Sequence, residues 1–96
     1  MRLTKFGFIV TGPQLSSRMV MTSPRFEMVA IGVASPADGP AAARQLVDEG
    51  VELIELCGGF GPAWTAKVLE AIGHRVPVGS VGYGPEAVAG LHALFG

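Results

Sequence analysis

The chain has 96 residues, of which 49% are hydrophobic and 16% are charged, so it can bury a core and is not a disordered segment. Its length suffices for a single domain over residues 1–96 but not for two. The net charge of −1 with scattered basic residues argues against a nucleic-acid partner, and no apolar run approaches the roughly 18 residues of a membrane span.

Four short apolar runs have the residue types of β-strands. They span Lys5–Thr11, Phe26–Ala34, Val51–Cys57 and Arg75–Val81. The last three read as apolar on both faces, which favours a parallel sheet covered by helices over a half-exposed antiparallel sheet. The first run follows two cations, as in a signal peptide, but it is too short for one and no cleavage site follows it.

The first predicted helix begins at Asp38, whose side chain can cap it. This start leaves Pro40 in the first turn, where the missing N–H of proline is tolerated. A start at Ser35-Pro36 competes with it, but that start would place Pro40 inside the helix. Apolar residues recur at helical spacing up to Gly50, which ends the helix.

Two further helices each open with a glycine–proline pair, which places proline where the first-turn N–H has no partner anyway. One runs from Gly61 to Gly73, and the other begins at Gly84 and continues to the C-terminus. The order of elements is therefore β-β-α-β-α-β-α. It predicts a small α/β sandwich with a four-stranded, mostly parallel sheet and three helices. The residues from Gly12 to Arg25 are predicted to form a long loop, and loops of this length are usually functional or mobile.

Residues 55–62, with the sequence ELCGGFGP, join the third strand to the second helix. Ligands of parallel sheets bind beyond the carboxyl ends of the strands, where helix N-termini present free N–H groups. Glycines let the backbone approach a ligand, so successive N–H groups can hold an anion or a developing oxyanion. The predicted ligand-binding residues of this loop are Gly58, Gly59, Phe60 and Gly61. A tight turn without a ligand is the alternative, and neither a dinucleotide fingerprint nor a P-loop is present.

Glu55 and Cys57 are the candidate catalytic residues, and alternation along the strand places both on one face. A carboxylate inside an apolar strand is desolvated, so unless it is paired its pKa rises toward the range useful in acid–base catalysis. An ion pair with Arg75 or Lys67, or a place at a subunit contact, is the structural alternative. Cys57 either fills the core, as free cysteine usually does, or becomes a thiolate before the helix N-terminus.

A cysteine–histidine enzyme is disfavoured by the positions of the two imidazoles. His92 lies in the last turn of a helix, where a charge–dipole role is favoured, and His74 lies at the amino end of the fourth strand. The single cysteine excludes an internal disulfide and a CxxC metal knuckle, so we expect no metal and a reducing, cytoplasmic location.

Other side chains are expected to reach the same edge of the sheet. Ser80 and Tyr83 follow the fourth strand in a second glycine-rich turn, and Arg18 and Arg25 lie in the long loop. The arginines can neutralise an anionic ligand, although solvated loop arginines are the default. Three methionines can pad an apolar pocket wall or fill the core: Met19, Met21 and Met28.

The run GVELIELCGGFGP, with the helix before it and the VPVG strand after it, resembles a family of short bacterial proteins catalogued as a domain of unknown function. The likeness extends from the first strand through Val81. It implies a small α/β fold and a shared site around Glu55, Cys57 and the glycine loop, but no activity. The chain departs from the family pattern at Ser17, where relatives carry a histidine, and in the turn at residues 82–86.

These observations support two main hypotheses. The first is a cofactor-independent enzyme of the lyase, isomerase or cyclase type that binds a small anionic or carbonyl compound, with Glu55 as the acid–base and glycine N–H groups holding an oxyanion. The alternative is a non-catalytic small-molecule binding or assembly module, and a cysteine-based thiol enzyme is a third, weaker one. We also expect a homo-oligomer, because a small α/β unit leaves flanks of its sheet or helices uncovered.

Overall fold

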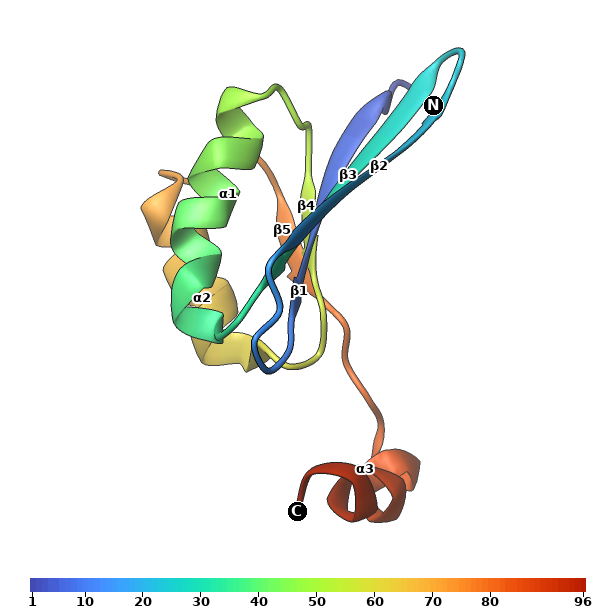
Figure 1. Cartoon of the computed structure of the whole chain (residues 1–96), viewed down its shortest axis with the longest axis vertical. Coiled ribbons are helices and arrows are strands. Elements are labelled where there is room, and N and C mark those ends of the chain that lie inside the picture. Colours follow the sequence, from blue (N-terminus) through green and yellow to red (C-terminus); the bar gives the residue numbers. More distant parts are fainter.

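The computed structural model describes all residues of the chain and contains one sheet with two helices packed against it (Figure 1). The strands are β1 (Lys5–Thr11), β2 (Ser17–Ser23), β3 (Phe26–Val33), β4 (Ile54–Leu56) and β5 (Val78–Ser80). The helices are α1 (Gly39–Asp48), α2 (Gly61–Ala71) and α3 (Val88–Phe95), with short 3-10 turns η1 (Pro36–Asp38) and η2 (Pro85–Ala87).

The sheet has five strands in the order β2-β3-β1-β4-β5. β1 lies at its centre and is parallel to both neighbours, pairing with β3 from Lys5↔Glu27 to Thr11↔Val33 and with β4 around Phe8↔Glu55. β5 is parallel to β4, and only β2 is antiparallel to its neighbour. The prediction of a mostly parallel α/β fold with three helices is therefore confirmed.

The predicted long loop is wrong for half of its length, because Ser17–Ser23 form β2. This strand makes a hairpin with β3 through Pro24 and Arg25, and the sheet has five strands rather than four. β2 is an edge strand with every residue exposed, so it needs no continuous apolar run of the kind that marked the other strands. The short apolar run Met19–Met21 between Arg18 and Thr22 was the available signal.

The helix starts follow the predicted positions, but the Asp38 side chain does not cap α1. α1 begins at Gly39 with Asp38 in the N-cap position, and the competing start at Ser35 is used as well, for η1. The Asp38 carboxylate accepts a hydrogen bond from the Ser35 backbone N–H at 3.3 Å. α2 begins at Gly61 as predicted, and Gly73 follows its end with a φ of 62°. β4 and β5 are shorter than predicted, with three residues each.

The core lies between the sheet and the two helices α1 and α2. Its twelve buried members are Ile9, Val29, Val33, Ala42, Ala43, Leu46, Val51, Ile54, Leu56, Phe60, Val68 and Ile72. Gly7 lets α1 approach the centre of the sheet closely, because a Cβ at that position would stand 2.7 Å from Cδ1 of Leu46. The helix-facing side of β1 is thereby fixed, and its even-numbered residues point the other way.

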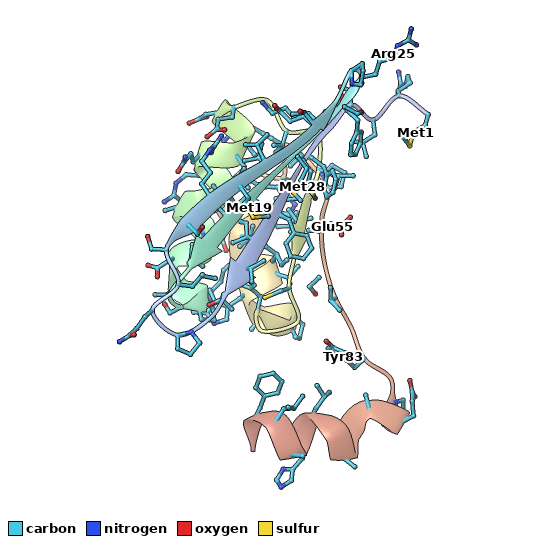
Figure 2. All side chains as sticks on the ribbon, turned by 45° about the vertical axis from the view of Figure 1, so that its right-hand side comes forward. Met1, Met19, Arg25, Met28, Glu55 and Tyr83 are labelled. Atoms are coloured by element: carbon cyan, nitrogen blue, oxygen red, sulfur yellow. The ribbon has the colours of Figure 1, made fainter.

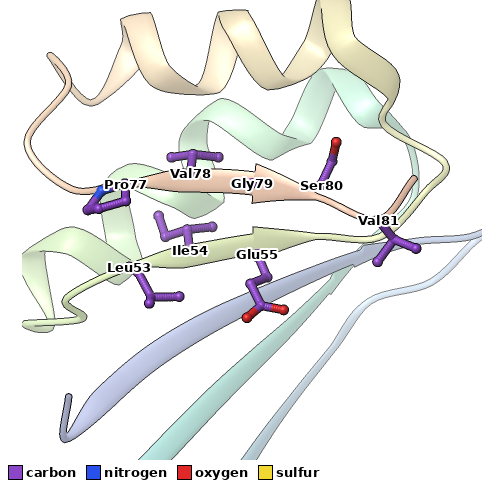
Figure 3. A pocket seen from close by; sticks show the side chains of 8 residues that line it. All are labelled: Leu53, Ile54, Glu55, Pro77, Val78, Gly79, Ser80 and Val81. Atoms are coloured by element: carbon purple, nitrogen blue, oxygen red, sulfur yellow. The ribbon is translucent and has the colours of Figure 1, made fainter. Parts of the chain in front are cut away.

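The expectation that helices cover the sheet fully is wrong for this chain, because α1 and α2 lie on the same face (Figure 1). We call the opposite side the open face. Figure 3 shows Leu53 and Glu55 of the β4 segment pointing to this side, whereas Ile54 points toward the helices. By the strand register its apolar side chains are Phe6, Phe8, Val10, Met19, Met21, Phe26, Met28, Ala30 and Leu53. The rings of Phe6 and Phe26 pack with their centroids 5.6 Å apart.

The last residues of the chain form a separate element that we call the C-terminal arm, residues 82–96. It consists of an extended linker, η2 and α3, and Figures 1 and 2 show α3 standing apart from the sheet and its helices. No residue of α3 is buried, and Leu94 and Phe95 are 77% and 83% exposed. No helix in the structure combines the length and the apolar character that a membrane crossing requires.

Candidate functional site

The carboxyl ends of β1 and β4 form the point at which the chain changes direction in the sheet. From β1 the chain continues to β2 and β3 on one side, and from β4 it continues through α2 to β5 on the other. In open α/β sheets, ligands bind in the crevice at such a switch point. Thr11 ends β1 and Cys57 directly follows β4, so these two residues lie at the crevice.

The thiol of Cys57 is held in place at this crevice. Its Sγ accepts a hydrogen bond from the Thr11 backbone N–H at 3.4 Å, and its own N–H donates to the Ile9 carbonyl at 3.1 Å. The side chain is half-buried and packs against the core from outside. The sulfur is therefore ordered without being sealed off from solvent.

The glycine loop after Cys57 leaves a set of backbone donors free. The Phe60 N–H donates to the Cys57 carbonyl at 3.1 Å, which closes a tight turn over residues 57–60. The N–H groups of Gly58, Gly59 and Gly61 make no hydrogen bond within the chain, and neither does that of Ala63 in the first turn of α2. Four unpaired donors thus stand at the N-terminus of a helix, where the helix dipole favours negative charge.

Close packing disfavours a side chain at two positions of this loop. A Cβ on Gly59 would stand 2.9 Å from Cγ2 of Thr11, and a Cβ on Gly58 would stand 3.0 Å from Cε2 of Tyr83. Gly61, in contrast, has a φ of 67°, which other residues rarely adopt. The loop is therefore shaped by its neighbours on β1 and on the C-terminal arm.

A cavity of about 750 Å³ opens between this loop and the arm. Its lining from the sheet edge comprises Thr11, Cys57, Gly58 and Gly59, and its lining from the arm comprises Tyr83, Leu91, His92, Phe95 and Gly96. The sequence reasoning placed Tyr83 at this edge but missed Thr11 and the apolar residues of α3. It missed them because the spacing of apolar residues in the last helix does not determine where that helix lies relative to the sheet.

His92 and Cys57 line the same cavity, but no hydrogen bond or ion pair joins them. The imidazole of His92 lies against Gly96 at the end of the chain. His74 is exposed and follows α2 with a φ of 56°. No three His, Cys, Asp or Glu side chains gather closely enough to hold a metal ion.

Glu55 lies outside the cavity, on the open face. It is exposed, so the expected desolvation inside an apolar strand is wrong for the single chain. The alternative of an ion pair is also wrong, because Arg75 donates to the Ile72 carbonyl at 2.7 Å and the ammonium of Lys67 lies 4.1 Å from the Trp64 ring centroid. Figure 3 shows its carboxylate on the same side of β4 as Leu53.

A second hollow, of about 390 Å³, borders Glu55 along β4 and β5. Ser80 lines this hollow and not the cavity beside Cys57, although it ends the neighbouring strand. Its side chain lies on the helix side of β5, because Ser80 pairs with Leu56 in the register and Leu56 is buried under the helices. The structure therefore divides the predicted site residues between two neighbouring hollows.

Two predicted ligand-binding residues have structural partners instead. Phe60 is only 3% exposed and belongs to the core, where its ring lies against Gly39. Arg18 lies on β2 and makes two hydrogen bonds to Glu49, from Nη1 at 2.9 Å and from Nη2 at 2.5 Å. This hydrogen-bonded pair raises the pKa of Arg18 and lowers the pKa of Glu49.

Arg25 and the methionines also lie away from the cavity. Arg25 is at the tip of the β2–β3 hairpin, and Figure 2 shows it at the opposite end of the molecule from Tyr83. Met21 and Met28 line a hollow of about 330 Å³ on the open face. The residues that meet at the cavity are therefore Cys57, Gly58, Gly59 and Tyr83 among those predicted from sequence.

Comparison with known proteins gives one family and no individual relative. Neither a search of curated proteins nor a search of solved structures returns a match. The model described as "Family of unknown function (DUF6506)" matches residues 4–96, a range that includes the glycine loop and the whole C-terminal arm. The chain belongs to this family of unknown function.

Proposed function

We propose that the protein binds a small molecule with an anionic or strongly polarised carbonyl group in the cavity between the glycine loop and the C-terminal arm. The observation that carries the proposal is the pair of unpaired N–H groups of Gly58 and Gly59, which line this cavity at the switch point of the sheet, just before the N-terminus of α2. Such donors at a helix N-terminus stabilise negative charge on a ligand.

The other wall of the cavity indicates the rest of the ligand. Leu91 and Phe95 are apolar and Tyr83 adds an aromatic ring, whereas no lysine or arginine lines the cavity. A ligand with one compact polar end and an apolar body fits this division. A polyphosphate, which needs several cations, does not.

A catalytic role is the second candidate, and one observation favours it. Glu55 lies two residues before Cys57 along the chain, and two residues of extended strand span about 7 Å. A carbonyl compound held by the loop N–H groups extends within reach of Glu55 if it lies along the open face. The Glu55 carboxylate then takes a proton from the carbon beside the carbonyl, the N–H groups hold the resulting enolate oxygen, and the proton returns at a new position.

Binding is tested by nuclear magnetic resonance of the ¹⁵N-labelled chain during titration with benzoate, with inorganic phosphate and with pyruvate. We expect saturable shifts of the N–H signals of Gly58 and Gly59, which line the cavity, and these shifts should be largest with the carboxylates. Gly59→Ala, which fills the approach to the crevice, should weaken binding, whereas Gly82→Ala, where a Cβ meets no atom within 4 Å, should not. Titrations with no saturable shift at these signals contradict the proposal.

A second readout does not depend on the fold of a glycine variant. Bound ligand should slow alkylation of Cys57, the only thiol, because Cys57 lines the same cavity. Alkylation that proceeds at the same rate at saturating benzoate would place the ligand elsewhere.

Catalysis is tested by following the exchange of pyruvate methyl protons in deuterated water. Glu55→Gln should reduce any exchange above the buffer rate by about 100-fold or more, the usual contribution of a general base. Glu70→Gln is the matched control, because Glu70 is exposed on α2 and its carboxylate makes no hydrogen bond or ion pair. Equal exchange by the two variants would remove Glu55 from the reaction.

The single free thiol fits a cytoplasmic setting, and this location is part of the proposal.

A further inference from the structure

Two apolar surfaces of this chain have no cover in the single molecule. One is the open face of the sheet, where Met19 and Met21 are 59% and 55% exposed. The other is α3, whose Leu94 and Phe95 are more exposed still. Parallel sheets are almost always covered on both faces, and a helix that is apolar on most sides is normally buried. Both surfaces therefore need a partner. Each is apolar, so the two can cover one another.

The chain exposes more surface than a compact monomer of its mass, and the excess is about the area that one partner buries in a typical interface. The chain exposes 6098 Å², whereas a compact monomer of this mass exposes about 5200 Å². The excess of about 900 Å² is close to the ~800 Å² that each partner buries in a protein–protein interface of ordinary size. The radius of gyration of 13.8 Å likewise exceeds the ~12.5 Å of a compact chain of this length.

The charges of the two surfaces are complementary. Glu55 is the only acidic or basic side chain on the open face, and His92 is the only basic side chain of the C-terminal arm. A carboxylate covered by apolar side chains needs a cationic or hydrogen-bonding partner. The imidazole of His92 can supply one where α3 crosses β4.

The arm of the same chain is held away from its own open face. The Val81 N–H donates to the Leu56 carbonyl at 3.0 Å, which continues the pairing of β5 with β4. Tyr83 then lies against Gly58, so the linker runs on past the carboxyl edge of the sheet. Folding back onto the open face would require this contact to break. The surface that α3 can cover without such a change belongs to a second copy.

We propose that two copies of the chain associate reciprocally, with α3 of each copy packed on the open face of the other. An eight-residue helix is about 12 Å long and spans two to three strands at ~4.8 Å spacing. Three strand spacings, ~14 Å, separate β4 from β2, so α3 with the side chains at its two ends reaches from Glu55 on β4 over Phe8 and Met28 to Met21 on β2. Each contact joins two different surfaces, the arm of one copy and the open face of the other. The two contacts are related by a two-fold axis, so the dimer is closed and leaves no free surface for further copies. His92 and Phe95 also line the cavity of the proposed ligand, so the variants that test the association lie outside that cavity.

The proposal is tested by sedimentation of three single variants. Leu94→Asp places a charge on the arm outside the cavity lining, and Met21→Asp places one on the open face. Each should raise the dissociation constant of the dimer about 30-fold or more, as loss of a central apolar contact does. Val20→Asp is the matched control, since Val20 is its neighbour on β2, is 47% exposed and points to the helix side. It should leave the dimer intact.

Mixing the two disruptive variants distinguishes this arrangement from others. Leu94→Asp keeps an intact open face and Met21→Asp keeps an intact arm, so a mixture can form one of the two contacts. We expect a mixed dimer that is weaker than the wild type but stronger than either variant alone. A wild-type chain that stays monomeric at high micromolar concentration overturns the proposal. A dimer that survives Leu94→Asp does so as well, because it would show that open faces meet without the arm.

Isotope-filtered nuclear magnetic resonance adds a direct readout. In a sample that mixes labelled and unlabelled chains, the Phe95 ring of one copy should show contacts to the Met28 methyl group of the other. If the protein sediments as a monomer and shows these contacts within one chain, the arm covers its own open face. That result would refute the reciprocal association.

Discussion

The backbone N–H of Thr11 donates to Sγ of Cys57, so the only thiol of the chain joins the ends of β1 and β4. Replacing Cys57 by alanine leaves this N–H without an acceptor in a half-buried place. We expect Cys57→Ala to lower the free energy of unfolding by about 1 kcal/mol, the usual value for such a hydrogen bond. Cys57→Ser keeps an acceptor and should lose less. Urea denaturation of the two variants measures the difference, and equal losses would mean that water replaces the sulfur.

Among the glycines of the loop, Gly59 is the one at which an added side chain should destabilise the fold most through steric contact. A Cβ there would stand 2.9 Å from Thr11 and 3.7 Å from the Cys57 sulfur, so Gly59→Ala should lower the free energy of unfolding by ~1–3 kcal/mol through overpacking. Gly82→Ala meets no atom and should be neutral or slightly stabilising, because it restricts only the unfolded chain. Thermal unfolding followed by circular dichroism compares them. Similar melting temperatures would indicate that the loop yields to the added methyl group.

Phe60 is expected to matter for stability and not for ligand contact. Its ring is buried and fills the space left by Gly39, so Phe60→Ala should lower the free energy of unfolding by about 3–5 kcal/mol. Phe60→Leu should lose much less, because most of the volume is kept. Tyr83→Ala provides the contrast, since Tyr83 is exposed and lines the cavity. Calorimetry should give Phe60→Ala a much lower melting temperature than Tyr83→Ala. The reverse order would mean that Tyr83, on the arm, contributes more to stability than Phe60.

Stability should fall in acid partly because of Glu52. Backbone N–H groups of Thr4 and Lys5 donate to its carboxylate at 2.7 Å and 2.9 Å and lower its pKa in the folded state. A lowered folded pKa gives stability that is complete above the pKa of the unfolded chain and is lost as the pH falls through the folded value. Glu52→Gln should therefore flatten the acid side of the stability curve.

The control for Glu52 is again Glu70→Gln, which removes a carboxylate without a hydrogen-bond partner. Urea denaturation at a series of pH values below neutrality compares the three proteins. A Glu52→Gln curve parallel to that of the wild type would show that the two hydrogen bonds do not persist in solution.

The sequence predicted best where local chemistry decides the structure. The proline positions fixed the starts of α1 and α2, and the apolar runs located four of the five strands, because these features depend on residues close to one another in the chain. β2 escaped because an edge strand with exposed residues lacks the apolar signature on which the other strands were recognised. Its three apolar residues, Met19, Val20 and Met21, are compatible with a loop until β3 is known to lie beside them.

The candidate site was predicted only in part, since it depends on tertiary placement. Cys57, Gly58 and Gly59 follow a strand directly, and Tyr83 lies against Gly58, so the loop chemistry and the neighbouring turn pointed to the same edge. Glu55 reads as a buried acid in sequence because its neighbours are apolar. The structure exposes it, because both helices lie on the other face. No pattern within one chain tells which face of a sheet two helices choose.

The central place of β1 has a consequence during synthesis. β1 is made before both of the strands between which it lies, and its two edges acquire partners only when Phe26–Val33 and later Ile54–Leu56 have left the ribosome. Until then one row of its backbone N–H and C=O groups stays open, beside the phenyl rings of Phe6 and Phe8. The nascent chain therefore passes through a stage in which a half-formed, adhesive sheet is exposed, and the rate of translation through α1 sets how long that stage lasts.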